Sequence, residues 1–375
     1  MILQTKGIVK NIVSPIIGRV TRFPYNLDYE ILISDDNINT LQHKFQAVLT
    51  TKEAPYIGNF SIGYSMKSLD HLEEGDIVVI NTDGVVNTIY RINSSHNFLL
   101  FTERCNSNCL MCSQPPKDKD DTPYFIHLHK KTIPLIPKDC IELGITGGEP
   151  TLLGNNFYEI LKQLKHELPD TEIHCLTNGR TFAWANVSEK IGNLNYKRLV
   201  LAIPLYSDVY HIHDYIVQAK DAFNQTMQGL YNLATHNIRI EIRIVLHKQT
   251  IPRLTHLAKF IYKNLPFVEH VAFMGLEHEG YTPFNIDKLW IDPVDYQTEL
   301  NDAITYLADF GMNVSIYNIQ LCTLKENLWK YSRKSISDWK NIYLEECNNC
   351  SVLEQCGGLF ASATKKHSKY IRAIN

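Results

Sequence analysis

The sequence predicts an α/β protein whose central part is a parallel sheet or partial barrel with helices on its outside. Three observations predict this fold. Six short apolar stretches alternate with amphipathic helical patterns, polar motifs directly follow three of these stretches, and seven of the nine cysteines fall into two groups. A β-rich segment precedes this part and a cysteine-rich segment follows it. We therefore expect three domains, at 1–96, 97–290 and 291–375.

Length and charge narrow the class of protein. A chain of 375 residues is long enough for a large core and for more than one domain. Its 37 basic and 40 acidic residues exclude a strongly basic nucleic-acid binder and an acidic disordered chain. No apolar run approaches the roughly 20 residues of a membrane-spanning helix, and the opening MILQTKGIVK lacks a signal-peptide pattern. We expect a cytoplasmic protein that binds neither nucleic acid nor membrane.

The first 96 residues carry short β-rich runs. ILISDD, FQAVLTT, DIVVIN and VVNTIYRI are rich in β-branched and aromatic residues and are bounded by turn signals. Asp83-Gly84 between two of them predicts a hairpin turn. No titratable cluster occurs here, so we interpret this segment as an accessory β domain.

The central part alternates strands and helices. The expected strands are 98–103, 141–146, 172–177, 198–204, 238–246 and 270–275. The expected helices include one that stops at Pro169, a long one from Tyr215 to His236, one opened by Thr250 and Pro252, and one from Asp292 and Pro293 to Gly311. Folds of this class place their chemistry on the loops at the carboxyl ends of the strands.

The first cysteine group lies in such a loop. Cys105, Cys109 and Cys112 have the spacing C-x3-C-x2-C directly after the first strand. A closed zinc site takes four ligands, whereas three thiolates can hold three corners of a four-iron four-sulfur (4Fe-4S) cubane and leave one iron open. An open coordination position is typical of a catalytic metal. The alternative is a zinc knuckle that lacks one ligand.

The second group supplies enough thiolates to close a site. It consists of Cys322, Cys347, Cys350 and Cys356. Zinc and an iron–sulfur cluster both accept four thiolates, so spacing alone does not decide between them. The isolated Cys140 and Cys175 stand in apolar stretches, where we expect small buried hydrophobes.

Two further motifs follow strand ends. Gly147-Gly148-Glu149-Pro150 comes after the second strand, and Thr177-Asn178-Gly179 ends the third. Loops from successive parallel strands meet at one edge of a sheet. The sequence therefore predicts that these motifs converge with the three-cysteine loop.

The order C-x3-C-x2-C, then Gly-Gly-Glu-Pro, resembles the radical S-adenosylmethionine (SAM) superfamily over roughly residues 98–281. The resemblance implies a 4Fe-4S cluster on the three cysteines whose open iron binds SAM. An electron would cleave SAM to methionine and a 5′-deoxyadenosyl radical, which abstracts hydrogen from a substrate. The implied cofactor-binding residues are Met111, Gly147, Gly148, Glu149, Pro150, Asn178, Ser207, Arg243, Met274, Gly275 and Leu276.

The resemblance gives several of these residues a role. Gly147 and Gly148 would allow close approach to the methionine part of SAM, and Glu149 would accept from its ammonium group. Ser207 and Arg243 would contact ribose and carboxylate, and Met274 to Leu276 would flank adenine. Met111 stands where the superfamily usually has an aromatic residue, and its backbone role toward adenine survives that change. The alternative for Arg243 is a structural ion pair.

The second cysteine group, as C-x2-C-x5-C after an upstream cysteine, resembles the SPASM or twitch extension of peptide-modifying radical SAM enzymes. Phe360 stands where the longer version has another cysteine. The resemblance therefore implies one auxiliary 4Fe-4S cluster rather than two.

Five stretches narrow the resemblance further. CLMCSQPPKDKDD, HDYIVQAKDAFNQTMQGL, VAFMGLEHEGY, SISDWKN and CGGLFASATKKHSK are similar to the His-Xaa-Ser system radical SAM maturase family HxsC. This similarity implies a bacterial enzyme that modifies a ribosomally made peptide or protein with His-Xaa-Ser repeats. It also implies a sister radical SAM protein, small partner proteins and an external electron donor.

Other interpretations stay open from the sequence. A different radical SAM chemistry, such as sulfatase maturation or a small-molecule rearrangement, uses the same motifs. A non-enzymatic zinc-binding scaffold explains the second cysteine group but not the three-cysteine loop with Gly-Gly-Glu-Pro. No catalytic side chain is identified: His127, His129, His211 and His213 fit helix-surface or loop positions better than a catalytic role.

Overall fold

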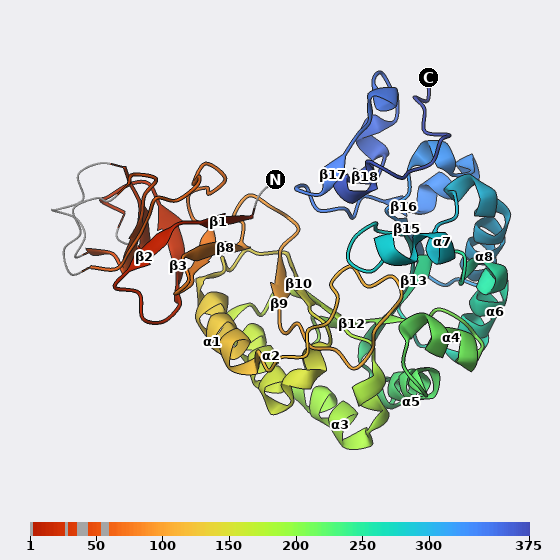
Figure 1. Ribbon diagram of the computed structural model, residues 1–375. Helices are drawn as coiled ribbons and strands as arrows, with labels where there is room; N and C mark the ends of the chain where they lie inside the picture. Colours follow the sequence, from red (N-terminus) through yellow and green to blue (C-terminus); the bar gives the residue numbers. More distant parts are fainter. Residues whose placement is uncertain (1–2, 27–28, 36–43, 54–59) are drawn as a thin grey trace. The chain divides into compact units, whose positions relative to one another are not determined.

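The computed structural model describes residues 3–26, 29–35, 44–53 and 60–375 (Figure 1). The chain folds into two compact units. Unit 1 comprises 1–101, 121–144 and 159–171, and unit 2 comprises 102–120, 145–158 and 172–375. The expected three-domain division with boundaries at 96 and 290 stays a prediction.

The β-rich segment of unit 1 forms one sheet of eight strands in the order β1-β8-β7-β3-β4-β5-β6-β2. The strands are β1 (Gln4–Lys6), β2 (Ile8–Lys10), β3 (Ile16–Thr21), β4 (Ile31–Ile33), β5 (Ala47–Leu49), β6 (Ile62–Tyr64), β7 (Ile77–Ile80) and β8 (Val85–Tyr90). The expected hairpin is confirmed, because β7 and β8 pair antiparallel and Gly84 has φ +83°. Only glycine adopts that conformation without strain.

The second sheet has the strand order β16-β15-β14-β13-β12-β11-β10-β9. Its strands are β9 (Phe98–Leu100), β10 (Glu142–Thr146), β11 (Glu172–Leu176), β12 (Leu199–Pro204), β13 (Arg239–Leu246), β14 (His270–Gly275), β15 (Val314–Tyr317) and β16 (Ser332–Arg333). The six expected strands are confirmed, and β11 to β16 pair in parallel. The strands β15 and β16 extend the sheet beyond the six expected. They were not predicted, because they are too short to give a clear pattern in the sequence.

Strand β13 shows how this sheet separates an apolar face from a polar one. Its even-numbered residues, Ile240 to Leu246, are buried hydrophobes, whereas Arg239, Glu241 and Arg243 alternate with them. Successive side chains of a strand point to opposite faces. Helices lie on the outer side of the sheet (Figure 1), so the charged residues occupy its inner face.

The helices are α1 (Thr122–Thr132), α2 (Asn155–Glu167), α3 (Ala185–Leu194), α4 (Tyr210–Val217), α5 (Ala222–Thr235), α6 (Leu254–Asn264), α7 (Ile286–Leu289) and α8 (Gln297–Asp309). The expected long helix from Tyr215 to His236 is wrong. The chain breaks between α4 and α5, where Gln218 and Asp221 have φ of 52° and 60°. The Asp214 carboxylate accepts from the backbone N–H groups of Asp221 (2.7 Å) and Phe223 (2.8 Å), which stabilises the break.

The expected start of the last helix is confirmed. The Asp292 carboxylate accepts from Val294 N–H at 3.1 Å and caps a short 3-10 helix that leads into α8. Gly311, with φ +77°, follows the helix. Within the described ranges, no helix is both long and apolar enough to cross a membrane.

Beyond β16 the chain is mostly loops and short 3-10 turns, with one small hairpin of β17 (Asn341–Ile342) and β18 (Leu359–Phe360). Its core is small: Cys347, Leu359 and Ile371 are buried together. A segment with so few apolar contacts gains little stability from burial.

Candidate functional site

The three-cysteine loop, which follows β9, is held by backbone hydrogen bonds within unit 2. Asn108 and Leu110 N–H donate to the carbonyls of Val217 and Ile216 at 3.0 and 2.9 Å. On its other side, Tyr281 N–H donates to the Cys112 carbonyl at 2.8 Å. The loop is therefore fixed by the end of α4 and by the segment after β14, although these lie far apart in the sequence.

Its three thiols lie close enough to influence one another. Burial raises the pKa of Cys105 to about 11, and the charges of Glu149 and Cys112 add to that rise. Burial also raises the pKa of Cys109 and of Cys112. A cysteine ligand must be a thiolate, so a bound cation has to supply the compensating charge. Three half-buried thiols at this spacing are a donor set that fits a metal cluster.

The two glycines of the Gly-Gly-Glu-Pro motif are required by the cysteine loop itself. A Cβ at Gly148 would lie 2.1 Å from the Arg104 carbonyl oxygen, and one at Gly147 would lie 2.7 Å from the Thr102 oxygen. Gly148 N–H donates to Thr102 O at 2.8 Å. Contact with the protein backbone therefore explains both glycines, independently of any approach to the methionine part of SAM.

Glu149 is completely buried and ties two loops together. Its Oε1 accepts from Thr151 N–H (3.1 Å), Thr151 Oγ1 (2.7 Å) and Thr177 Oγ1 (2.7 Å). Its Oε2 accepts from Asn178 N–H at 2.7 Å. A carboxylate oxygen has about two lone-pair directions, so Oε2 is the atom with room for another donor. The expected contact with the SAM ammonium stays a prediction for Oε2.

The loop after β11 clamps the cysteine loop. Asn178 Nδ2 donates to Asn106 Oδ1 at 2.6 Å and lies 4.0 Å from Cys105 Sγ. Arg180 donates to Ser107 Oγ at 3.0 Å. The three motifs that the sequence placed on separate loops therefore lie together. Beside them is a cavity of about 540 Å³ whose lining includes Cys105, Asn106, Lys117 and Gln218.

The remaining predicted SAM contacts differ in their surroundings. Ser207 is completely buried, and its hydroxyl accepts from Val209 N–H at 3.1 Å, which makes it a local cap rather than an exposed ribose contact. Arg243 Nε lies 3.1 Å from Met274 Sδ. A Cβ at Gly275 would lie 2.3 Å from Asn318 O, so close packing against the end of β15 requires glycine there.

Three other residues of the predicted set lie in packed surroundings. Met111 is buried in a hydrophobic cluster with Tyr206, and Leu276 packs against that cluster. Pro150 opens a short 3-10 helix. Their expected roles toward SAM stay predictions.

The second cysteine group surrounds one small cavity of about 10 Å³. Cys322, Cys347, Cys350 and Cys356 all line it, together with apolar side chains that include Leu353. Burial raises the pKa of Cys322 and of Cys347. Four thiols around one small, mostly apolar cavity fit a closed metal site.

The segment after Ile371 closes this cavity. Ile374 N–H donates to Cys350 Sγ at 3.4 Å. Ser351 holds the Ile374 carbonyl with both its N–H and its Oγ at 2.8 Å. Hydrogen bonds to ligand sulfur stabilise the thiolate form.

Among the residues that the structure describes, no group of three or more His, Cys, Asp or Glu side chains is arranged to hold a single metal ion. Sulfurs around one zinc lie within about 4 Å of one another, because each Zn–S bond is about 2.3 Å. A four-iron cubane spreads its thiolates farther apart. The absence of a single-ion arrangement among the described residues is therefore compatible with cluster binding by the two cysteine groups.

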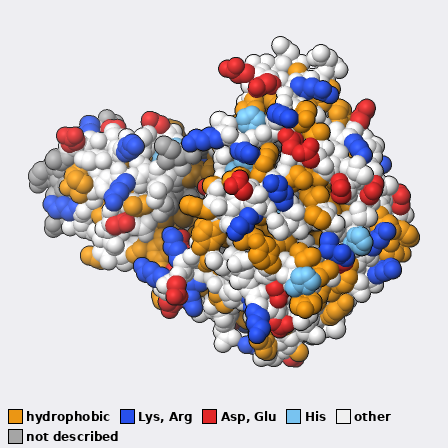
Figure 2. All heavy atoms as spheres, turned by 45° about the vertical axis from the view of Figure 1, so that its right-hand side comes forward, with side chains coloured by type: hydrophobic (Ala, Val, Ile, Leu, Met, Phe, Trp, Pro, Cys, Tyr) orange, Lys and Arg blue, Asp and Glu red, His pale blue; other side chains and the backbone are white. Residues whose placement is uncertain are grey.

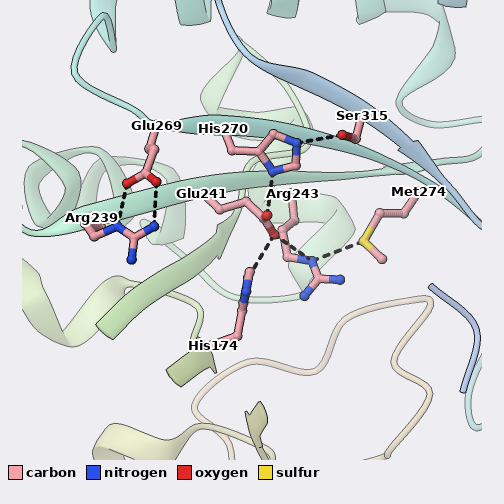
Figure 3. A network of polar contacts seen from close by, with 8 residues as sticks. All are labelled: His174, Arg239, Glu241, Arg243, Glu269, His270, Met274 and Ser315. Carbon is pink, nitrogen blue, oxygen red and sulfur yellow. Dashed lines mark hydrogen bonds and ion pairs between the residues drawn. The ribbon is translucent and has the colours of Figure 1, made fainter. Parts of the chain in front are cut away.

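A polar network that the sequence did not reveal lies on the inner face of the sheet (Figure 3). Glu241 Oε1 lies 3.2 Å from His174 Nε2, and its Oε2 lies 2.7 Å from His270 Nδ1. Burial alone would raise the pKa of Glu241, but hydrogen bonds from both histidines and the charge of Arg243 outweigh it and lower the pKa. The local signal was the alternation of charged and apolar residues along β13.

The histidines considered from the sequence are of two kinds. His127 and His211 are exposed, as expected for surface positions. His129 and His213 are buried instead, and burial lowers the pKa of each to about 4. Of the isolated cysteines, Cys175 is fully buried as expected, whereas Cys140 is only half-buried because it lies at an edge before β10.

Residues 99–261 match the family model described as the Radical SAM superfamily. This part of the chain, which contains the three-cysteine loop, Gly147 to Pro150 and Arg243, is thereby supported as a radical SAM domain. That family implies a 4Fe-4S cluster and SAM as cofactors. The match does not extend to the second cysteine group.

Individual proteins match more weakly. MJ0907, an uncharacterized protein of Methanocaldococcus jannaschii, is 25% identical over an alignment of 257 residues, and the match covers 62% of this chain and 86% of that protein. The crystal structure of Streptococcus suis SuiB matches with a TM-score of 0.48 at 15% identity. The match covers 62% of this chain and 51% of the SuiB chain. Native anSMEcpe with bound AdoMet has a TM-score of 0.43 at 18% identity, over 58% and 63%. The chain thus spans about half the length of SuiB.

Proposed function

We propose that this protein is a radical SAM enzyme that modifies a ribosomally made peptide or protein of the His-Xaa-Ser repeat type. The observation that carries the proposal is the meeting of three thiols, the Gly147–Pro150 turn and the Asn178 loop at one place in a chain whose residues 99–261 match the Radical SAM superfamily.

Cys105, Cys109 and Cys112 would hold the 4Fe-4S cluster. When bound, the cluster supplies the single electron that cleaves SAM. The chain's own residues shape the place where this happens. Glu149 joins the turn to the Asn178 loop through four hydrogen bonds, and the two glycines let that turn lie against Thr102 and Arg104. These contacts keep the thiols at fixed positions.

The remaining SAM contacts are assigned by resemblance to Arg243, Met274, Gly275 and Leu276. In support of this, Arg243 is held on the inner face of the sheet between Glu241 and Met274. A guanidinium that is fixed in this way binds a carboxylate with little loss of side-chain entropy. Ser207 is not among the proposed SAM contacts, because its hydroxyl is buried.

The second cysteine group would hold one auxiliary 4Fe-4S cluster, as in a SPASM or twitch extension. All four thiols line one cavity, which supports a fully ligated cluster with no open iron. Such a cluster transfers electrons or stabilises the fold rather than binding SAM.

The peptide substrate is supported by the HxsC-like stretches and by the balanced charge of the chain. On the face shown in Figure 2, basic and acidic side chains are interspersed without a large area of one sign. A sister radical SAM protein, small partner proteins and an external electron donor belong to the same proposal.

The proposal is tested by anaerobic purification and reconstitution. We expect a brown protein with about eight irons per chain, if both groups hold 4Fe-4S clusters, and 5′-deoxyadenosine formation from SAM with dithionite. A colourless zinc protein that does not cleave SAM contradicts the proposal.

The substrate is tested by coexpression with a partner protein that carries His-Xaa-Ser repeats. Mass spectrometry after digestion, with stereochemical analysis of the residues, is compared with and without this protein. SAM cleavage without any change in the partner indicates a different radical SAM chemistry.

A further inference from the structure

The inner face of the second sheet carries a cavity of about 420 Å³ near the amino ends of its strands. Its lining comes from β11 to β16 and includes His174, Glu241, His270 and Ser315. None of these residues belongs to the cysteine sites. Glu241 lies 3.6 Å from Arg243 on the same strand, so the cavity begins next to the proposed SAM contact.

The carboxylates that line this cavity are already paired. Arg239 bonds Glu172 at 2.7 Å and Glu269 at 2.6 Å. Glu241 is shared by His174, His270 and Arg243. At the edge, Arg333 donates to the main-chain oxygens of Lys330 and Ser332. A cationic ligand would find no unpaired carboxylate among these lining residues, which favours a neutral polar ligand.

The hydrogen bonds determine which nitrogen of each imidazole carries the proton. The ionised Glu241 carboxylate is an acceptor only, so His174 Nε2 and His270 Nδ1 must both donate to it. In neutral His270, Nε2 is then an acceptor, and Ser315 Oγ donates to it at 3.0 Å. In neutral His174, Nδ1 is left with a lone pair.

Of the two histidines in this network, His174 is the one whose ring keeps an unused lone pair. Its side chain is 23% exposed, against 4% for Glu241 and 14% for His270. The ring lines the cavity, and within the described part of the chain its hydrogen bond to Glu241 is the only one that it makes. Glu241 acts as a positioning residue, because it holds the ring in the tautomer that can accept.

We propose that this cavity is a substrate subsite in which His174 Nδ1 accepts a hydrogen bond from a neutral O–H or N–H donor of a peptide side chain. The inference rests on the proposed peptide substrate and specifies which kind of peptide side chain enters the cavity on the inner face of the sheet. Serine and neutral histidine side chains carry such donors. The subsite would thus select for side-chain chemistry on the inner face of the sheet, next to Arg243.

The test measures binding of a synthetic peptide of three His-Gly-Ser repeats to the anaerobically reconstituted protein by calorimetry. Two analogues replace every Ser by Ala or every His by Phe. We expect His174→Leu to raise the Kd of the intact peptide about fivefold, the effect of one lost hydrogen bond. The exposed His127 provides a matched control, and His127→Leu should leave the Kd unchanged.

The analogues distinguish a hydrogen bond from a loss of shape. The analogue that lacks the donor should bind the wild-type protein about fivefold more weakly and should be insensitive to His174→Leu. Glu241→Gln provides a second variant, since its amide can donate to His174 Nε2 and reverse the tautomer. We expect Glu241→Gln to weaken binding of the intact peptide, and we expect no further loss of affinity when His174→Leu is added. Thermal unfolding shows whether each variant is folded.

Three outcomes overturn the inference: equal affinity of wild type and His174→Leu, equal loss for all peptides, or no binding of the intact peptide by wild type. Failure of the proposed function is measured separately, as SAM cleavage by the wild-type protein and as modification of the coexpressed partner. A protein that cleaves SAM but shows no His174-dependent affinity disproves the subsite alone.

Discussion

The two cysteine groups of unit 2 differ in how far each closes around its centre. The three-cysteine loop borders a cavity of about 540 Å³ with polar residues such as Asn106 and Lys117 in its lining. The four-cysteine group encloses about 10 Å³ between apolar side chains and is covered by Ile374. An open centre leaves space for a substrate on the metal, and a closed one leaves none.

The two centres are also stabilised differently. The open one lies at the carboxyl ends of β9, β10 and β11, and Glu149, Asn178 and Arg180 hold its loop by hydrogen bonds. The closed one lies in a segment with little regular structure and a small core. If both groups hold clusters as proposed, the metal would contribute more to local folding at the closed centre than at the open one.

The largest expected effect follows from removing one thiol of the three-cysteine loop. Cys105→Ala removes a ligand that no neighbouring cysteine can replace, so SAM cleavage should fall to the level measured without protein. Iron should fall by about half, if each group holds one cluster. The half-buried Cys140 provides the control, because Cys140→Ala should retain both iron and cleavage. Retained cleavage in Cys105→Ala would show that the open centre lies elsewhere.

Breaking the closed set should leave SAM cleavage in place. Cys322→Ala should also lose about half of the iron, because one of four ligands is gone. Deuterium exchange of residues 341–374 should increase, while β11 to β14 keep their protection. Iron analysis and mass-resolved exchange test this. Loss of SAM cleavage in this variant would mean that the two centres are not independent.

Acid should weaken the structure behind the open centre. His213 Nδ1 accepts from Tyr206 N–H at 3.3 Å, and burial lowers the pKa of His213 to about 4, below its ordinary 6.5. Because the folded pKa is depressed, this stability is present above pH 6.5 and is lost as the pH falls toward 4. Between pH 7 and 5 the loss is about 2 kcal/mol.

Replacement of the titrating ring isolates this contribution. His213→Phe should show a shallower loss of unfolding free energy on acidification than the wild type, whatever its stability at pH 7. Urea unfolding of both proteins at pH 7 and 5 gives the two slopes. Equal slopes would show that His213 is not the group that titrates.

The close packing of the open centre predicts a steric effect. Gly148→Ala places a Cβ 2.1 Å from the Arg104 oxygen, so the turn and the cysteine loop must move apart. We expect a loss of about 1–3 kcal/mol in stability, together with weaker SAM binding. Gly357→Ala is the control, since it also lacks a positive φ and the nearest atom to its Cβ, the Ile319 oxygen, would lie at 3.5 Å. Equal effects of the two substitutions would show that the close contact with Arg104 is not the cause of the loss.

The smallest effect concerns the cover of the closed centre. Ile374→Pro removes the N–H that donates to Cys350 Sγ, while Ile374→Val keeps it. Losing a hydrogen bond to a charged sulfur destabilises the more negative, reduced state, so the potential should fall by some tens of millivolts. Redox titration followed by electron paramagnetic resonance measures the shift. Identical potentials in both variants would remove Ile374 from the site.

Much of the fold was predictable because it depends on local patterns. The six central strands and the caps at Asp292 and Gly311 follow from residue periodicity and from the conformations that single residues favour. The break between α4 and α5 was missed, because the apolar positions continue through it. The Asp214 carboxylate that stabilises it bonds residues seven and nine positions away.

The sequence by itself determined the chemistry of the ligands: three cysteines in one loop, four in another, and glycines in the turn that meets them. Only the tertiary structure decided that Glu149 already accepts four hydrogen bonds and that the Ser207 hydroxyl is buried. It also decided that one carboxylate on β13 holds histidines from β11 and β14. Spacing within a loop is a property of neighbouring residues, whereas these contacts depend on the register of strands that are far apart in the chain.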